Sequence, residues 1–475
     1  MQNAFLLASK SYTEKQAGLL FFVFGMSQFM FQTPAGYIMD YTDKKVALLA
    51  MAAIGTTLCT IATAVLAKDN GANLTLMVII KFIQGGITAM IPPGLNSITQ
   101  GIVGAVGMTH QVSRNEMMNH LGTAILVLSG SLTAFALYPN IGVLFVVSPL
   151  FCILTVYFLC RIKPEHIDHN AARGLKKVSD APDEVASTLS KPLPTIPGNK
   201  NIKTTPSFNF GFDARSETGP SDDTLSAESP MAVLRDPILL MFTFICFMFH
   251  TANGCVLPLI MQTLAVGDGR RGILMSGLCI IIAQLTMVCS AKVCGDYSKV
   301  YGRKLLFLLG LFSVSVRCSI IVGLLSIAKQ TSLIRMLLLS TQVLDGVGAG
   351  VFGTMYILVT SDISGGTGRF AMTLGITTAS MSIGGTMSGY LGEMLAQDFG
   401  YRAAFTILGT MSMIPALTYL FFMPETLPAE AVETVSSKTG GMTGIQEGEE
   451  EGGDAKADYK QWTNVEGNKA DPQLV

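Results

Sequence analysis

Long apolar stretches alternate with short polar ones along most of this chain, a pattern typical of helices that cross a membrane. Such a helix needs about 20 mostly apolar residues to cross the hydrocarbon core. Eleven segments meet this requirement: 17–39, 46–67, 74–95, 118–138, 141–160, 238–264, 272–294, 305–327, 333–358, 370–396 and 402–423. The pattern predicts an all-α polytopic membrane protein with about 11 transmembrane helices.

The two halves of the chain repeat each other. Lys81 to Gly86 recurs as Gln342 to Val347 at an offset of 261 residues, and Gly36 to Lys45 recurs as Gly295 to Lys304 at an offset of 259. Because the offsets are nearly equal, one duplication explains both matches. Duplicated helical membrane proteins are most often secondary transporters, whose substrate path lies between the halves.

The repeat also predicts that the first half lacks one helix. Gly36 to Lys45 follow the first span of their half, whereas Gly295 to Lys304 follow the second span of theirs. Residues 1–16 are too short and too polar to supply the counterpart of 238–264. We expect that the natural chain begins upstream of Met1; the alternative is that a helix has been lost.

Four regions follow from these patterns: an N-terminal transmembrane bundle at 1–160, a linker at 161–236, a C-terminal six-helix bundle at 237–423 and a tail at 424–475. The linker holds ten Lys/Arg and eight Pro with few large apolar residues, and the tail carries an acidic run. Neither can bury enough surface to fold, so both are predicted to be disordered. Basic clusters at helix ends, Lys44 with Lys45 and Arg303 with Lys304, favour the cytoplasm for both.

Composition agrees with a membrane protein. The chain is 49% hydrophobic and only 14% charged, with a mean hydropathy of +0.47, which is more apolar surface than a soluble core could hide. All nine cysteines fall inside apolar runs and predict small packed residues rather than disulfides or metal ligands. A net charge of −1 without a concentrated basic face gives no indication of a nucleic-acid partner.

Motifs for other kinds of chemistry are missing from the sequence. There is no Gly-x4-Gly-Lys-Ser/Thr phosphate loop, so ATP-driven transport is not supported. We also find no nucleophile, metal-ligand or paired-carboxylate arrangement that would indicate an enzyme. The sequence therefore implies no enzymatic activity and no cofactor.

A charged loop motif occurs once in each half. Its residues are Gly36, Asp40, Lys44 and Lys45 in the first copy, and Gly295, Gly302, Arg303 and Lys304 in the second. They resemble the G-x-x-x-D-x-x-G-R-K/R motif of the major facilitator superfamily, although Asp43 replaces the usual glycine and Lys299 the usual acidic residue. The resemblance covers about residues 14–427. It implies two pseudo-symmetric six-helix bundles, here with the first helix missing, and gradient-driven alternating access through a central cavity.

The physical role expected of the motif is to hold two helices together in one state of the transport cycle. A carboxylate at Asp40 can accept hydrogen bonds at the terminus of a neighbouring helix and pair with a basic side chain. Gly36 would let those helices pack closely. Lys299 cannot accept hydrogen bonds, so we expect no equivalent contact of this kind in the second half.

Lys81, Gln84 and Gly85 resemble the R-x-x-Q-G motif of proton-coupled antiporters in the same superfamily, with Lys in place of Arg. A cation within the membrane is costly unless it faces a partner or a wet cavity, so Lys81 is a candidate for the substrate or proton pathway. The alternative is that its side chain extends to the membrane surface.

Asp345 is the strongest single candidate for a proton carrier. It occupies the position that matches Gln84, and in our assignment no other carboxylate lies in the middle of a span. An isolated ionised carboxylate there would be costly, so Asp345 must bind a proton or face a cation. Arg317 on the preceding span is the obvious partner, and a static pair between the two is the alternative to a proton carrier.

His250 and Asn253 complete the predicted pathway. The resemblance implies that their helix lines the cavity, where an imidazole and an amide could bind substrate or relay a proton; a histidine bonded to a neighbouring helix is the alternative. Gly254 and Pro258 predict a bend nearby. A cavity rich in Met and Phe with few charges suits a small amphipathic organic solute rather than a polyanion.

We therefore expect a secondary active transporter that exports a small organic solute in exchange for protons. Proton-linked or facilitated uptake of a sugar or organic acid is the first alternative. A non-transporting sensor or scaffold derived from the same superfamily is the second. The expected partners are the solute, protons and the lipid bilayer, and we expect a monomer in the plasma membrane rather than an organelle membrane.

Overall fold

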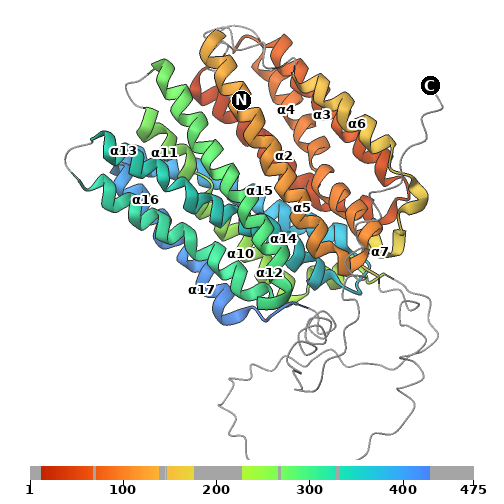
Figure 1. Cartoon of the computed structure of the whole chain (residues 1–475). Coiled ribbons are helices and arrows are strands. Elements are labelled where there is room, and N and C mark those ends of the chain that lie inside the picture. The colour runs from red at the N-terminus through yellow and green to blue at the C-terminus, as the bar shows by residue number, and fades with distance from the viewer. Residues whose placement is uncertain are drawn as a thin grey trace, which may run out of the picture.

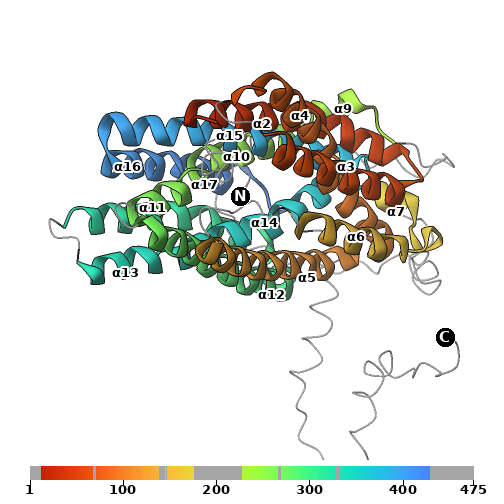
Figure 2. The same ribbon diagram turned by 90° about the horizontal axis from the view of Figure 1, so that it is seen from above.

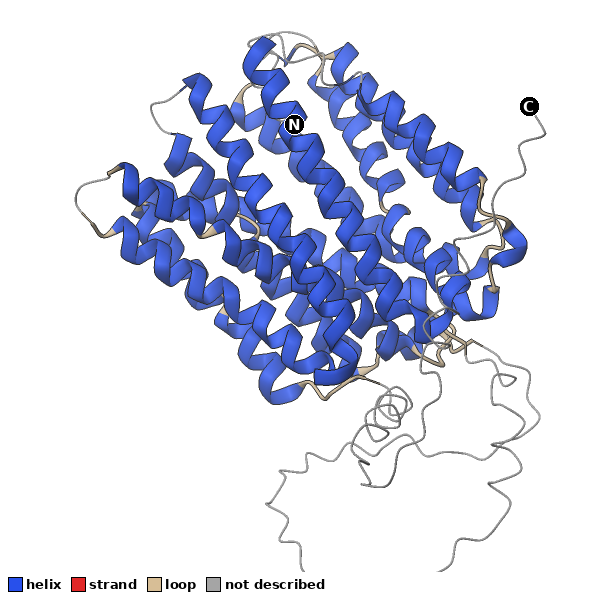
Figure 3. Cartoon of the chain, in the orientation of Figure 1, coloured by secondary structure: helices blue, strands red, loops and turns tan. Residues whose placement is uncertain are grey.

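The computed structural model describes residues 12–67, 71–137, 145, 147–175, 227–265, 269–327 and 331–427. Within these ranges the regular structure is helical throughout, and Figure 3 shows helices joined by short loops with no strand. The predicted all-α class is confirmed. Residues 176–226 and 428–475, which hold most of the predicted linker and tail, lie outside the described residues.

The first helix that the structure describes is capped at its N-terminus. Thr13 accepts a hydrogen bond from the backbone of Gln16, whose side chain accepts one from the backbone of Thr13, so both helix-terminal donors are satisfied. The described helices of this half are α2 (Glu14–Tyr41), α3 (Lys45–Leu66), α4 (Leu74–Thr88), α5 (Ile91–Leu137) and α6 (Val147–Cys160).

The second half begins in the same way. Asp236 accepts hydrogen bonds from the backbone of Ile238 and Leu239, and Pro237 occupies the first helical position, where its missing N–H costs nothing. The helices of this half are α10 (Pro237–Asn253), α11 (Val256–Ala265), α12 (Gly269–Leu325), α13 (Ser332–Ser340), α14 (Gln342–Ser364), α15 (Phe370–Phe399), α16 (Tyr401–Met411) and α17 (Met413–Phe422).

Two of these helices turn back on themselves at a single glycine. Gly104 in α5 and Gly302 in α12 have φ of 66° and 81° with ψ of 176° and 169°, a conformation that a residue with a Cβ rarely adopts. The contacts of α12 with α14 show the reversal. The limb 269–301 runs parallel to α14, with Ala283 beside Gly346 and Met287 beside Gly350. The limb 303–325 runs antiparallel to it, because Arg303 pairs with Asp362 and Arg317 with Asp345.

Six helical stretches within the described residues are long and apolar enough to cross a membrane: Lys45–Leu66, Leu74–Leu137, Pro237–Leu264, Leu274–Leu325, Ser332–Ser364 and Tyr401–Phe422. Two of them contain a reversal and so make two passages each. With α2 and α15, which are more polar, and α6, which is shorter, the described residues make eleven passages. Each overlaps one predicted segment.

One boundary differs substantially from the prediction. The passage predicted at 118–138 begins directly after Gly104, so Arg114 and Glu116 lie within a helix rather than in a loop. The polar residues of 109–120 interrupt the apolar run in the sequence, although part of this stretch, including Thr109 and Ser113, is buried against other helices.

The ends of the predicted linker are folded. Residues 161–175 contain a short 3-10 helix (Pro164–His166) and α7 (His169–Arg173), and residues 227–236 contain α9 (Pro230–Leu234). We call the end of the molecule where these segments lie the linker face; it is the lower end in Figure 1. The expectation of disorder is therefore wrong for 161–175 and 227–236, and the rest of the predicted linker lies outside the described residues.

The two halves meet along two helix pairs, which we call seams. In Figure 2, α2 and α15 lie along one edge of the molecule, and α5 and α12 along the other. At the first seam, the backbones of Gly36 and Gly375 approach the partner helix so closely that neither position has room for a side chain. At the second seam, Ser113 Oγ donates to the carbonyl of Ala291 at 2.6 Å.

Candidate transport site and gate

The first seam is held at the linker face by the carboxylate of Asp40. This side chain is 1% exposed and accepts hydrogen bonds from the backbone N–H of Ala371 at 3.0 Å and of Met372 at 2.8 Å. These donors belong to the first turn of α15, which intrahelical bonds leave unsatisfied and where the helix dipole favours a negative charge. Asp40 therefore caps a helix of the opposite half.

The neighbouring basic residues of the first motif have different surroundings. Lys45 is fully buried, and its ammonium donates to the carbonyl of Met39, whereas Lys44 is exposed. The Asp40 carboxylate and the buried Lys45 ammonium thus both act on backbone groups. No direct ion pair between them forms within the described residues.

Aromatic side chains at the end of α2 reinforce this seam. The guanidinium of Arg369, which precedes α15, lies 5.4 Å from the ring centre of Tyr37 and 4.8 Å from that of Tyr41. Arg173 of α7 lies 5.9 Å from the Tyr41 ring centre. All three distances suit cation–π attraction. The sequence analysis missed these tyrosines, although their i, i+4 spacing was a usable signal.

The folded ends of the linker extend across the linker face and contact both halves. On the first half, Asp168 N donates to Gly101 O at 2.9 Å, and Ser97 Oγ donates to Ala172 O at 3.1 Å. On the second half, the loop before α15 bonds to the linker ends: Gly366 N donates to Gly174 O at 2.8 Å, and Glu228 N to Thr367 O at 2.9 Å. These contacts close the linker face between the halves.

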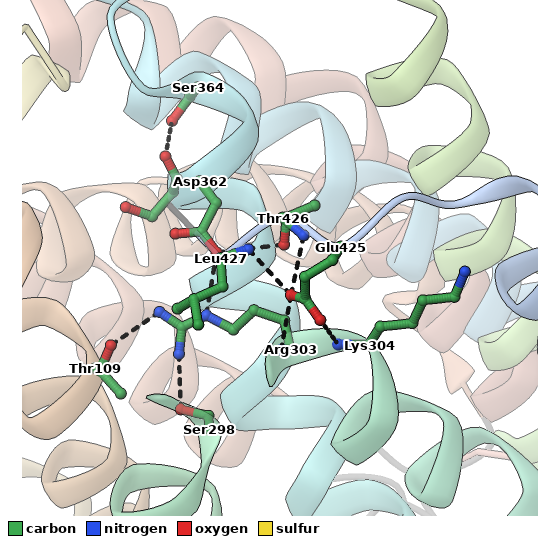
Figure 4. Close-up of polar contacts among 10 residues, drawn as sticks. Thr109, Ser298, Arg303, Lys304, Asp362, Ser364, Glu425, Thr426 and Leu427 are labelled. Atoms are coloured by element: carbon green, nitrogen blue, oxygen red, sulfur yellow. Dashed lines mark hydrogen bonds and ion pairs between the residues drawn. The ribbon is translucent and has the colours of Figure 1, made fainter. Parts of the chain in front are cut away.

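The second seam is held at the linker face by Arg303 of α12 (Figure 4). Its guanidinium donates to Asp362 at 3.1 Å, to Ser298 at 2.7 Å and, across the seam, to Thr109 of α5 at 2.9 Å. Lys299, at the position that matches Asp40, donates to the carbonyl of Val106 at 3.3 Å. At the linker face, this seam is therefore held by the basic side chains of Arg303 and Lys299 rather than by a carboxylate.

Glu425 supports Arg303 from the end of α17. Its two carboxylate oxygens accept the backbone N–H groups of Arg303 at 2.8 Å and Lys304 at 3.0 Å, which begin the limb 303–325 after Gly302 (Figure 4). The side chain of Lys304 donates to the carbonyl of Met423 at 2.7 Å. Residues directly after the last passage thus fix the position of the second motif.

Inside the membrane, Asp345 and Arg317 form a buried ion pair. Arg317 is 0% exposed and donates to Asp345 and, at 2.9 Å, to Gln342. Both charged residues belong to the second half, on the limb 303–325 and on α14. The sequence predicted the partnership, and the structure places it in the interior of one half rather than between the halves.

The matching position of the first half holds Lys81 and Gln84. Lys81 is 3% exposed and donates to Gln84 Oε1 at 2.9 Å, while Gln84 Nε2 donates to Thr60 at 3.0 Å. The side chain of Lys81 does not extend to the membrane surface. Gly85 packs directly on Phe24 and Ser27 of α2, with no room for a side chain. This cluster also lies in the interior of its half.

His250 and Asn253 lie at the end of α10, where the helix is interrupted at Gly254 and Cys255 before α11 begins. His250 Nδ1 lies 3.1 Å from the carbonyl of Cys246 on its own helix, and its ring packs edge-on against Phe352 at 5.0 Å between ring centres. Asn253 Oδ1 is buried without a hydrogen-bond partner within the described residues. The helix is interrupted next to Gly254, where a bend was predicted, and Asn253 retains an unused acceptor.

The arrangement of two similar halves joined by polar seams agrees with a sequence model of the Major Facilitator Superfamily, which matches residues 2–327 and 295–447. The chain belongs to the major facilitator superfamily.

Relatives and solved structures of this superfamily support the assignment. Two uncharacterised major facilitator transporters of Mycobacterium tuberculosis, from strains CDC 1551 / Oshkosh and ATCC 25618 / H37Rv, are 30% identical over 428 residues, which cover 90% of this chain and 89% of theirs. The proton:xylose symporter XylE, solved with bound 6-bromo-6-deoxy-D-glucose, has a similar fold, with a TM-score of 0.60 at 13% identity over 91% of this chain and 95% of its own. The protein is thus an integral membrane transporter.

An apolar groove of about 450 Å³ opens between α2, α10 and α15. Among its lining residues, Phe29, Leu240 and Phe244 are exposed on the outer surface of the helices. This groove therefore lies at the outer, lipid-facing side of the first seam.

A polar cluster at the second seam escaped the sequence analysis. Glu116 and His120 of α5 lie 3.6 Å apart, between carboxylate Oε2 and imidazole Nε2, and His120 Nδ1 lies 2.8 Å from Gln284 Oε1 of α12. The prediction that Asp345 is the only carboxylate in the middle of a span is wrong, because the passage that contains Glu116 was predicted to begin after it. The i, i+4 spacing of Glu116 and His120 was the signal that could have revealed it.

Proposed function

We propose that this transporter exports a small organic solute in exchange for protons, by alternating access to a site between its two halves. The linker face is held together by hydrogen bonds of Asp40, Arg303 and the linker ends. Such contacts can break and re-form at moderate cost, which rocking of two halves requires. An exporter of this kind belongs in the plasma membrane.

The observation that carries proton coupling is the Asp345 carboxylate, buried beside Arg317 within the membrane. Protonation would remove its negative charge and weaken the ion pair, so a proton at this position changes how the limb 303–325 and α14 hold together. Lys81 with Gln84 forms the matching polar cluster of the first half. The few intramembrane charges favour an amphipathic organic solute over a polyanion.

The experiment uses the purified protein in liposomes that contain a pH-sensitive dye. Solutes of four classes, namely amphipathic organic compounds, sugars, organic acids and multiply charged anions, are placed on one side of the membrane. We expect the amphipathic compounds to drive protons in the direction opposite to their own movement. Transport of a multiply charged anion, or solute movement without proton flux, would contradict the proposal.

Asp345→Asn keeps the shape of the side chain and removes its charge, so we expect it to abolish solute-driven proton flux. Asp296→Asn is a matched control, because Asp296 lies on the exposed surface of α12 and its loss should leave the flux unchanged. Unaltered pH dependence in Asp345→Asn would reject the role of this residue.

Uptake of a sugar or organic acid is the second candidate function. The fold-similar XylE is a proton:xylose symporter, so this architecture supports proton-linked movement of a solute in the same direction as the proton. The same liposome assay separates the two functions, because uptake moves proton and solute together whereas export by antiport moves them in opposite directions.

A further inference from the structure

Glu116 lies at the boundary between the two halves. It belongs to the limb 105–137 of α5, and its side chain is 20% exposed. Across the boundary stands α14, where a methyl group added to Gly353 would lie 3.9 Å from Glu116 Oε2. The carboxylate therefore faces the opposite half directly.

Neutral groups and one imidazole surround this carboxylate. Asn119 Nδ2 donates to Glu116 Oε2 at 3.4 Å, and His120 Nε2 lies 3.6 Å from the same oxygen. No Lys or Arg within the described part of the chain forms an ion pair with Glu116. An ionised carboxylate that is about four-fifths buried without a cation is costly, so this position favours a bound proton as long as the halves are closed upon it.

His120 connects the carboxylate to the second seam. With Gln284 Oε1 as acceptor, Nδ1 of His120 carries a hydrogen and donates at 2.8 Å across the seam to α12. The other ring nitrogen, Nε2, is buried without a hydrogen bond and faces Glu116. A second proton on the ring can therefore only occupy the nitrogen beside the carboxylate, which makes the pair a site for one shared proton.

Asp345, unlike Glu116, lies in the interior of one half rather than at the boundary between the halves. Its partners Arg317 and Gln342 belong to the same half as Asp345, so the three move together when the halves rock. The surroundings of Glu116 come from both halves, with α5 on one side and α12 and α14 on the other. Rocking at the linker face must change how much water reaches Glu116.

We propose that Glu116, with His120, is a second proton-binding site, which couples protonation to separation of the two halves. In the closed linker face, the Glu116 carboxylate binds one proton and becomes a neutral carboxylic acid. When α5 and α12 separate, water reaches the group, the proton leaves to that water, and the carboxylate is restored. Low pH therefore favours the closed linker face and high pH favours the open one. This inference deepens the proposed proton coupling and rests on it.

Infrared spectroscopy of the full-length protein in lipid nanodiscs tests the site without a known solute. The C=O stretch of a protonated carboxylic acid is recorded as the pH is raised from about 5 to about 8, near the range in which carboxyl and imidazole groups titrate in proteins. We expect Glu116→Gln to lose the intensity of one titrating carboxyl group and Glu116→Asp to retain it. An unchanged band in Glu116→Gln would overturn the proposal.

Hydrogen–deuterium exchange at residues 104–113 reports whether the proton is coupled to the seam. After correction for intrinsic exchange rates, we expect the wild-type protein to be more protected at low pH. Glu116→Gln, which resembles the protonated form, should stay protected across the pH range. Asp296→Asn, which removes a charge at an exposed position of α12, should keep the pH response. A pH response in Glu116→Gln equal to that of the wild type would overturn the coupling.

The two proposals can fail separately. If the wild-type protein moves solute without protons while the Glu116 band and the seam still respond to pH, proton-coupled transport is rejected and the Glu116 site is retained. If solute-driven proton flux is present but Glu116→Gln leaves the band, the seam and the flux unchanged, transport is retained and the site is rejected.

Discussion

At the linker face, the first half contacts the second through a hydrogen-bond acceptor, whereas the second half contacts the first through hydrogen-bond donors. In the first half, Asp40 is an acceptor that caps α15, with hydrogen bonds of 3.0 and 2.8 Å. At the matching position of the second half, Lys299 is a donor to the carbonyl of Val106 at 3.3 Å, and the seam depends on Arg303 and its bond to Thr109. Both seams therefore hold the two halves together, although a negative side chain forms the contacts at the first seam and positive side chains form them at the second.

The same difference appears inside the membrane. The first half places one charge, Lys81, beside the neutral Gln84. The second half places an acidic and a basic residue, Asp345 and Arg317, beside the neutral Gln342. A buried pair of opposite charges is stable only while both members are present. We therefore expect the second half to be more sensitive to the loss of one polar side chain than the first.

We expect Arg317→Met to cause the largest loss of stability. This change keeps much of the side-chain volume but leaves Asp345 buried without a cation, which costs about 3 to 5 kcal/mol for a broken buried pair. Thermal unfolding of the purified protein in detergent measures the loss of stability. Adding Asp345→Asn to the same protein should restore most of it, because the uncompensated charge is then removed.

Lys81→Met is the counterpart in the first half. It leaves Gln84 Oε1 without its donor, and a buried unsatisfied polar group costs about 1 to 3 kcal/mol. We therefore expect a smaller decrease in stability than for Arg317→Met. An equal or larger decrease would contradict the difference between the halves.

The sequence allowed prediction of the features that depend on local patterns. The eleven passages follow from apolar runs, and the partnership of Asp345 with Arg317 follows from the cost of a lone intramembrane charge. The reach of Asp40 to a helix terminus follows from the motif that it resembles. The partner helix, α15, lies 331 and 332 residues along the chain from Asp40 and could not be named from spacing.

Features that depend on tertiary contacts were missed. Glu116 was placed outside the membrane because Ser113, Arg114 and Asn115 interrupt the apolar run, although the helix continues through them. Polar residues at a helix–helix seam form hydrogen bonds with groups of the neighbouring helix. A prediction based on hydropathy alone therefore assigns them wrongly to a loop. The folding of Asp168 and Arg173 onto the linker face was missed for a related reason, since α7 has only five residues and is stabilised by contacts with other segments.

After Arg317→Met and Lys81→Met, we expect Asp40→Asn to cause the next largest loss of stability. The amide has the same shape but no charge, so the charge-assisted bonds to the first turn of α15 weaken, at a cost of about 1 to 2 kcal/mol. Hydrogen–deuterium exchange at Ala371 and Met372 should then become about 5- to 30-fold faster. Asp43→Asn is the matched control, because Asp43 is exposed and its contact with His169 is a surface one at 3.7 Å. Equal exchange in Asp40→Asn and the wild type would reject Asp40 as the group that holds the first seam.

The smallest effect is expected from Lys299→Ala. Its bond to Val106 lies at an exposed position, where a single charged contact contributes about 0 to 1 kcal/mol. Exchange at residues 104–110 should therefore change by less than about fivefold, which corresponds to 1 kcal/mol. Arg303→Gln in the same assay should give the larger change, since it removes the buried guanidinium that reaches Thr109. If Lys299→Ala opened the second seam as much as Arg303→Gln, the lysine would be a direct counterpart of Asp40, and the halves would differ in the sign of the charge but not in the residue that holds the seam.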